Sequence, residues 1–202
     1  MSVPNALTAS RLVMAAAMMA FLFTPMPFGT SLALLVFALA AATDALDGQL
    51  ARRVYGVTAF GALLDPLADK VLVSAALVSF VQLQIIPAWI VVMILAREFL
   101  VTGLRVLAAG HGRSIAAGPW GKHKTVWQVI VIVSLLAGRA VQRDLLPRVA
   151  PGRIAGFTPW FEEFAFVLAA AAALITVASG AIYVHRHMDL LGFEGCGRGT
   201  DR

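Results

Sequence analysis

The chain has 202 residues, of which 60% are hydrophobic and 13% charged, with a formal net charge of +5. Soluble globular proteins carry about 25% charged residues, so too few charged side chains are present to cover a surface that faces water. The composition and a mean hydropathy of +0.85 argue against a soluble enzyme and exclude a disordered chain, collagen and a coiled coil. The surface is therefore expected to face lipid.

The basic residues and the cysteine content exclude further classes. The 16 Lys and Arg residues are scattered between apolar segments, whereas a nucleic-acid-binding protein gathers them on one soluble face, so no nucleic-acid partner is expected. This distribution is instead typical of membrane topology and of contact with anionic lipid. The single cysteine, Cys196, excludes an intrachain disulfide and a cysteine-based metal site.

Six apolar stretches predict an all-α integral membrane protein, a bundle of six transmembrane helices. A span needs about 20 residues, and only the last stretch reaches that length without polar interruption. The others become long enough only if helices continue through the charged segments 44–52, 61–70 and 97–105. Ionisable residues inside membrane helices are usually functional. The stretches are 12–23, 31–43, 71–86, 88–96, 126–137 and 164–184.

The first apolar stretch predicts a retained span, because it follows one basic residue and ends in TPMPFG without a cleavage site for a signal peptide. The positive-inside rule then places the N-terminus in the cytoplasm, with one membrane domain over residues 1–187 and a short polar tail over 188–202. The basic residues expected inside are Arg11, Arg52, Arg53, Arg105, Arg113, Lys122, Lys124, Arg186, Arg198 and Arg202. Those expected in the third outer loop are Arg139, Arg143, Arg148 and Arg153.

The segment 44–70 concentrates the chemistry, because four aspartates fall on two helical faces. Positions 44, 47, 48, 51 and 52 are offset by 0, 3, 4, 7 and 8 residues and share one face, and positions 61, 65 and 69 share another. The short turn at 55–58 is expected to make the two helices antiparallel neighbours, so that the acidic faces meet. The residues on the faces are Asp44, Asp47, Gly48, Ala51 and Arg52, and Gly61, Asp65 and Asp69.

Four carboxylates at the inner half of a bilayer repel one another and are costly to desolvate. Bound divalent cations relieve both problems, and ligation by oxygen alone favours Mg²⁺, Mn²⁺ or Ca²⁺ over zinc. Two such ions would form a clamp for displacement at phosphorus. Gly48 leaves a gap at which a ligand could lie against the helix, and Arg52 offers a planar fork for phosphate oxygens.

Two other interpretations remain open at this point. The charges could be ordinary helix-end residues, with Asp65 capping a helix end next to Pro66. A cation transporter or a proton-relay protein would also suit paired intramembrane carboxylates, although it would leave the accompanying glycine and arginine unexplained.

The pattern D-x-x-D-G-x-x-A-R, eight residues, then G-x-x-x-D-x-x-x-D resembles the signature of the CDP-alcohol phosphotransferase family, with no departure in residue type or spacing. The resemblance implies a six-helix membrane enzyme, usually a homodimer, that transfers a phosphatidyl-type group from a CDP-linked donor and releases CMP. It also implies two Mg²⁺ (or Mn²⁺) ions per active site. Asp44 and Asp65 would bridge them, Asp47 would complete one site, and Asp69 would serve the other and take the acceptor's proton. The implied donor contacts are Asn5, Gly48, Ala51, Arg52 and Thr58.

Four further segments resemble the bacterial phosphatidylglycerophosphate synthase branch: PNALTASR at 4–11, REFLVTGLR at 97–105, GKHKTVWQ at 121–128 and ITVASGAIY at 175–183. His123 departs from the aromatic residue that is usual in this branch. The implied reaction transfers a phosphatidyl group from CDP-diacylglycerol to sn-glycerol 3-phosphate at the cytoplasmic face of the cell membrane, and cardiolipin synthase is the near alternative. Because the acidic site would repel a dianionic acceptor, a separate cationic pocket is expected, formed by Arg105, Lys122 and Lys124.

Overall fold

The computed structural model describes residues 3–54, 59–110 and 119–186, and side chains within 10–43, 70–106, 126–185 and at 108. Every regular element in these ranges is helical, which agrees with the predicted all-α class. The elements are α1 (Val3–Phe23), α2 (Gly29–Val54), α3 (Ala59–Gln82), α4 (Ala88–Gly110), α5 (Pro119–Ala140), the π-helical turn η1 (Val141–Leu145), α6 (Leu146–Val149), the 3₁₀ turn η2 (Pro151–Arg153) and α7 (Ile154–Arg186).

The helices continue through the charged segments, as the length argument predicts. Helices α2, α3 and α4 have 26, 24 and 23 residues, and at 1.5 Å per residue each is about 35–39 Å long. Asp65 lies six residues after the start of α3, and the helix runs on through Pro66. The interpretation of Asp65 as the cap of a helix end is therefore wrong, because no helix end lies there.

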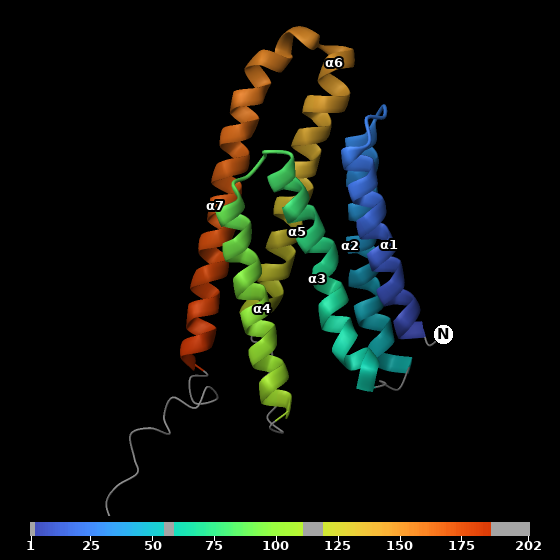
Figure 1. The fold of residues 1–202 in the computed structure, drawn as a ribbon, viewed down its shortest axis with the longest axis vertical. Helices are drawn as coiled ribbons and strands as arrows, with labels where there is room; N and C mark the ends of the chain where they lie inside the picture. Colours follow the sequence, from blue (N-terminus) through green and yellow to red (C-terminus); the bar gives the residue numbers. More distant parts are fainter. Residues whose placement is uncertain (1–2, 55–58, 111–118, 187–202) are drawn as a thin grey trace, which may run out of the picture.

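The six long helices alternate in direction along the bundle (Figure 1). We call one end the acidic end: α2 ends there and α3 begins there, together with the start of α1, the end of α4, the start of α5 and the end of α7 (Figure 1). We call the other end the turn end. Helices α5 and α7 extend beyond the other helices at the turn end, where η1, α6 and η2 join them (Figure 1).

The core is formed by apolar side chains from several helices. Helix α1 packs against both α2 and α3, α4 packs against α7, and α5 contacts α2 and α7. Gly138 allows the close approach of α5 and α7, because a Cβ atom there would lie 2.1 Å from the ring of Phe161. The largest side chains with almost no exposed surface are Phe37, Phe80, Phe161, Met18, Leu22 and Leu77.

The outside of the bundle is also apolar. Leu174 on α7 and Val92 on α4 are 73% and 63% exposed, and such exposure is costly in water but not in lipid. Over the described residues, one stretch, Pro151–His185, is both long and apolar enough to cross a membrane. This stretch includes the sixth apolar segment, the one that needs no charged residues to reach the required length.

The segment predicted as the third outer loop consists of the short helical turns η1, α6 and η2, and it packs on the turn between α1 and α2. Phe28, just before α2, has a φ of 60° and offers no polar side chain to cap the helix. Instead Asp144 in η1, which is 3% exposed, accepts hydrogen bonds of 2.8 Å from both the backbone N–H and the hydroxyl of Ser31. Arg148 donates to the Asp144 carbonyl and lies over the Phe28 ring, 4.1 Å from its centroid.

Candidate active site

The helix segments that bear the predicted site residues all lie at the acidic end (Figure 1). The end of α2 and the start of α3 bear the aspartates, α1 bears Asn5 near its start, and α4 bears Arg105 near its end. Lys122 and Lys124 lie in the first turns of α5. Residues spread over more than 100 positions of the sequence are therefore brought to one end of the bundle.

The acidic motif needs two continuous helices with adjacent ends, and the backbones of α2 and α3 provide them. Both helices are continuous through the motif, so the offsets predicted to share a face do so. Only residues 55–58 separate the end of α2 from the start of α3. A chain spans at most about 3.6 Å per residue, so these two helix ends lie within roughly 18 Å of each other.

The structure does not describe the side chains that would bind metal and donor. Those of Asn5, Lys122, Lys124 and all motif positions in 44–69 lie outside the described side chains, and Thr58 lies outside the described residues altogether. Among the side chains that are described, no cluster of three or more potential metal ligands occurs. The convergence of the four carboxylates therefore stays a prediction.

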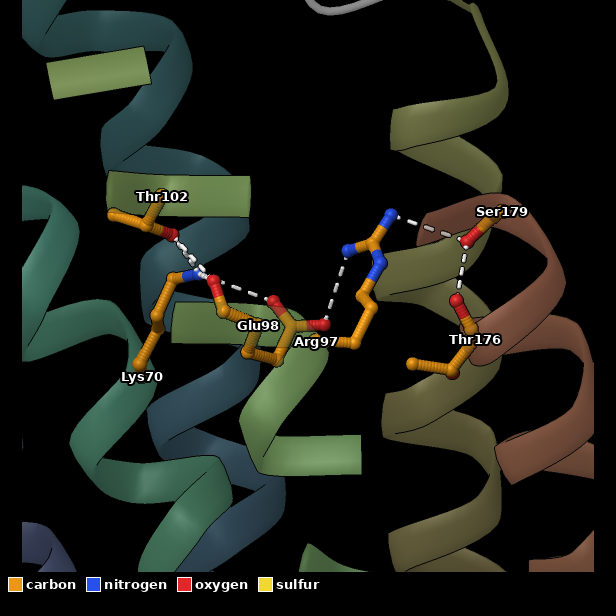
Figure 2. Close-up of polar contacts among 6 residues, drawn as sticks. All are labelled: Lys70, Arg97, Glu98, Thr102, Thr176 and Ser179. Atoms are coloured by element: carbon orange, nitrogen blue, oxygen red, sulfur yellow. Dashed lines mark hydrogen bonds and ion pairs between the residues drawn. The ribbon is translucent and has the colours of Figure 1, made fainter. Parts of the chain in front are cut away.

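A network of charged and polar side chains begins immediately after the last aspartate of the motif (Figure 2). The ammonium of Lys70 on α3 forms an ion pair of 3.0 Å with the Glu98 carboxylate on α4 and donates to the Glu98 carbonyl oxygen at 3.1 Å. It also donates to the hydroxyl of Thr102, which in turn donates to the Glu98 carbonyl at 2.8 Å. The Lys70 and Glu98 side chains are only 21% and 15% exposed.

Arg97 extends this network to α7 (Figure 2). Its guanidinium contacts the Glu98 carboxylate at 3.3 Å and donates to the hydroxyl of Ser179 at 3.1 Å. The next residue, Gly180, leaves room for the arginine stem, because a Cβ atom there would lie 2.5 Å from the Arg97 Cγ atom. The Arg97 Nε atom is buried and has no hydrogen-bond partner within the described part of the chain.

Arg105 is the one predicted acceptor contact whose side chain is described. It is exposed, and its guanidinium carbon lies 5.7 Å from the centroid of the Tyr183 ring on α7. Such a cation–π contact holds the arginine near the end of α7 without neutralising its charge. The guanidinium therefore keeps its capacity to bind an anion.

Lys70, Glu98 and Ser179 were not predicted from the sequence as parts of one site. A signal was present, because α3 and α4 are joined at the turn end and bear opposite charges at matching depth. Lys70 lies 12 residues before the end of α3, and Glu98 lies 10 residues after the start of α4. At 1.5 Å per residue these depths are about 18 Å and 15 Å.

Comparison with known proteins decides between the classes that the motif left open. The family model of CDP-alcohol phosphatidyltransferases matches residues 1–178. The chain belongs to this family. It is therefore an enzyme, and the transporter interpretation is wrong.

Two similar proteins named CDP-diacylglycerol--glycerol-3-phosphate 3-phosphatidyltransferase come from Bacillus subtilis and Pseudomonas fluorescens. The Bacillus protein is 42% identical over 147 residues, which cover 67% of this chain and 76% of that protein. The Pseudomonas protein is 40% identical over 143 residues, covering 68% of this chain and 73% of that protein. A protein from Haemophilus influenzae with the same name is 37% identical, covering 67% of this chain and 75% of its own length.

Proposed function

We propose that this enzyme transfers the phosphatidyl group of CDP-diacylglycerol to sn-glycerol 3-phosphate, giving phosphatidylglycerophosphate and CMP. The observation that supports the proposal is the identity of 42% and 40% to two phosphatidyltransferases whose names state this reaction. The uninterrupted acidic motif on α2 and α3 supplies the residues that the chemistry needs.

In the proposed reaction the primary hydroxyl of glycerol 3-phosphate attacks the phosphorus atom that bears diacylglycerol. The bond from that phosphorus to the oxygen it shares with the CMP phosphate breaks, and CMP leaves with both bonding electrons. The hydroxyl proton passes to the carboxylate of Asp69, which acts as the general base. Gly48, Ala51 and Arg52, all on α2, together with Asn5 and Thr58, would hold the donor.

The four aspartates suit two Mg²⁺ or Mn²⁺ ions, because all their metal-binding atoms are oxygens. They are Asp44, Asp47, Asp65 and Asp69. Bound there, the ions would neutralise the diphosphate and lower the cost of charge that develops on the leaving CMP. They would also offset the mutual repulsion of the four carboxylates.

The acceptor phosphate is expected to bind Arg105, Lys122 and Lys124, away from the acidic motif that would repel it. Arg105 is exposed and held against Tyr183, and the two lysines begin α5 at the same end of the bundle. A cationic pocket at this place would select an acceptor with a phosphomonoester over an uncharged alcohol.

In the membrane we infer that all six long helices span the bilayer, that the N-terminus and the acidic end face the cytoplasm, and that two copies form a dimer. Helices of 21 to 33 residues are long enough to span about 30 Å of hydrocarbon. The exposed apolar side chains on α4 and α7 suit contact with lipid. The expected distribution of Lys and Arg supports the orientation.

The reaction is tested with the purified protein in lipid nanodiscs, radiolabelled CDP-diacylglycerol and a panel of acceptors. CMP release is expected with glycerol 3-phosphate, little release with phosphatidylglycerol, and none in excess EDTA until Mg²⁺ or Mn²⁺ is restored. Arg105→Ala is expected to raise the apparent KM for glycerol 3-phosphate about tenfold or more, because it removes a charged hydrogen bond, with the KM for the donor little changed.

Each opposite result has a distinct meaning. Cardiolipin formed readily from phosphatidylglycerol, with glycerol 3-phosphate ignored, would refute the acceptor but not the phosphatidyl transfer. Full turnover in excess chelator would refute the metal site. An unchanged KM in Arg105→Ala would remove that residue from the acceptor pocket.

A further inference from the structure

The contact between Lys70 and α4 fixes one helix against another in several directions (Figure 2). The ammonium meets the Glu98 carboxylate, the Glu98 carbonyl and the Thr102 hydroxyl, three oxygen atoms spread over one turn of α4. An ion pair alone would tolerate sliding and rotation of the helices. Three acceptors around one ammonium restrict both movements more closely than an ion pair alone.

The contact between Lys70 and Glu98 lies close to the proposed catalytic residues along both helices. Lys70 directly follows Asp69 on α3, so fixing the lysine fixes the helix within one residue of the proposed base. Glu98 lies seven residues before Arg105 on α4, about 10 Å along the helix. The contact therefore joins the helix of the base to the helix that bears an acceptor contact.

The network also holds α4 itself. Arg97, next to Glu98, donates to Ser179 on α7, and Ser179 donates to the Thr176 carbonyl oxygen at 2.8 Å within that helix (Figure 2). Farther along the same two helices, Arg105 lies against Tyr183. Helix α4 is thus anchored on both sides, to α3 through Lys70 and to α7 through Arg97.

On these grounds we propose that Lys70 and Glu98 are a positioning pair, which sets the distance and rotation of the Asp65 and Asp69 face of α3 relative to the acceptor pocket on α4. The inference rests on the proposed function. The pair joins α3 to α4, whereas α2 bears most of the proposed donor contacts. Its loss should therefore impair the chemical step with acceptor while leaving donor and metal binding intact.

If Lys70 and Glu98 served stability alone, a variant that kept the stability would also keep kcat. Replacing both members of a buried ion pair by apolar residues is often neutral for stability, whereas removing one member leaves an unpaired buried charge. The double variant Lys70→Met/Glu98→Met therefore separates the two roles. The variant leaves neither Lys70 nor Glu98 as an unpaired charge, and Arg97, which loses its contact with Glu98, keeps its hydrogen bond to Ser179. It is therefore expected to fold, with a melting temperature between those of the wild type and the single variants.

The experiment measures kcat and both KM values in nanodiscs for Lys70→Met, Glu98→Gln, the double Met variant and Lys70→Arg. Binding of Mn²⁺ is followed separately by electron paramagnetic resonance. A misplacement of about 1 Å can lower a rate about 100-fold, so the single and double variants are expected to lose about 10- to 100-fold in kcat. The donor KM and Mn²⁺ affinity should stay within about threefold. Lys70→Arg keeps the ion pair but replaces the compact ammonium by a planar fork, so it should recover only part of the rate.

The matched control is Ser79→Ala, which also lies on α3. The Ser79 hydroxyl is buried and donates to the Ala75 carbonyl oxygen within α3, so it joins no second helix. This variant should leave kcat unchanged. Wild-type kcat in the double Met variant would overturn the positioning role, as would a parallel loss of Mn²⁺ and donor binding in every single variant. Failure of the wild type to use glycerol 3-phosphate would instead refute the proposed function, so the two failures are distinguishable.

Discussion

The position of the Arg97 side chain depends on a single residue of α7, Gly180, which has no Cβ atom. The arginine stem passes so close to α7 that a Cβ atom on this glycine would lie 2.5 Å from Cγ and 3.4 Å from Nε of Arg97. The side chain is mostly buried, so it has little room to move aside. The glycine thus lets one guanidinium reach both Glu98 on its own helix and Ser179 on α7.

We therefore predict that Gly180→Ala lowers the stability of the protein by about 1–3 kcal/mol, the usual cost of an overpacked contact. In a protein of this size that corresponds to a fall in melting temperature of roughly 2–12 °C, measured by differential scanning fluorimetry in detergent. The matched control is Gly156→Ala on the same helix, where an added Cβ meets nothing within 4 Å. A melting temperature that is the same in both variants would contradict the close packing of Arg97 on α7.

Sequence patterns were sufficient to predict the aspartates of the site but not the ion pair beside them. The aspartates are recognisable because they lie on a fixed helical repeat within one segment. The Lys70–Glu98 pair joins residues 28 positions apart, and no local repeat links them. Their equal depth could have been counted from the turn between α3 and α4, but the rotation of each helix, which decides contact, depends on packing.

At the element scale, α2 receives its N-terminal cap from a distant part of the chain. The first backbone N–H groups of a helix lack partners within it, and a polar residue just before the helix usually supplies one. In this protein the residue just before α2 is the apolar Phe28. The buried carboxylate of Asp144 accepts a hydrogen bond from the backbone N–H of Ser31 instead. A negative charge at this end of a helix is also favourable for the helix dipole.

We predict that Asp144→Ala destabilises the protein by about 1–2 kcal/mol, the upper part of the range for loss of a helix cap. Ser31→Ala should cost less, because it removes the hydroxyl bond and keeps the backbone N–H bond to Asp144. Thermal melts measure both, with Glu163→Ala, an exposed carboxylate on α7, as the control for loss of charge. Equal stability of Asp144→Ala and the Glu163→Ala control would refute the cap.

The cap on α2 gives a structural role to the predicted third outer loop, to which the sequence assigned none. The predicted outer loop is a series of short helical turns, and its Asp144 and Arg148 hold the turn between α1 and α2. Because α2 bears half of the acidic motif at its other end, the segment stabilises the helix on which the proposed metal site is built.

At the scale of the whole molecule, the orientation in the membrane can be tested with the protein's one cysteine. Cys196 lies in the tail beyond the described residues, and six spans with the N-terminus inside place it in the cytoplasm. We predict that a membrane-impermeant maleimide leaves it unlabelled in right-side-out vesicles and labels it after permeabilisation. An odd number of spans would put the two ends of the chain on opposite sides.

The control uses a cysteine placed at the opposite end of the bundle. Val149 in α6 is 79% exposed, so Val149→Cys in a Cys196→Ser background should be labelled in intact right-side-out vesicles. Labelling of Cys196 without permeabilisation, or protection of the new cysteine, would contradict the proposed topology.

Composition and segment length alone indicated a helical protein with a lipid-facing surface, and the spacing of the aspartates predicted where its chemistry lies. An apolar composition with few charges demands a lipid-facing surface, and the continuation of α2, α3 and α4 through their charged segments followed from the length that a span requires. The acidic motif could be recognised because all its positions lie within two consecutive helices, where helical periodicity is enough to group them.

The contacts between different helices could be recognised only in the folded chain. The ion pair of Lys70 with Glu98, the packing of Arg97 on Gly180 and the cap of α2 by Asp144 all join different helices. Each depends on how the helices are rotated and how deeply they overlap. The rotation and overlap of the helices are set by the fit of many side chains across the core, so they cannot be predicted from the periodicity of any single helix.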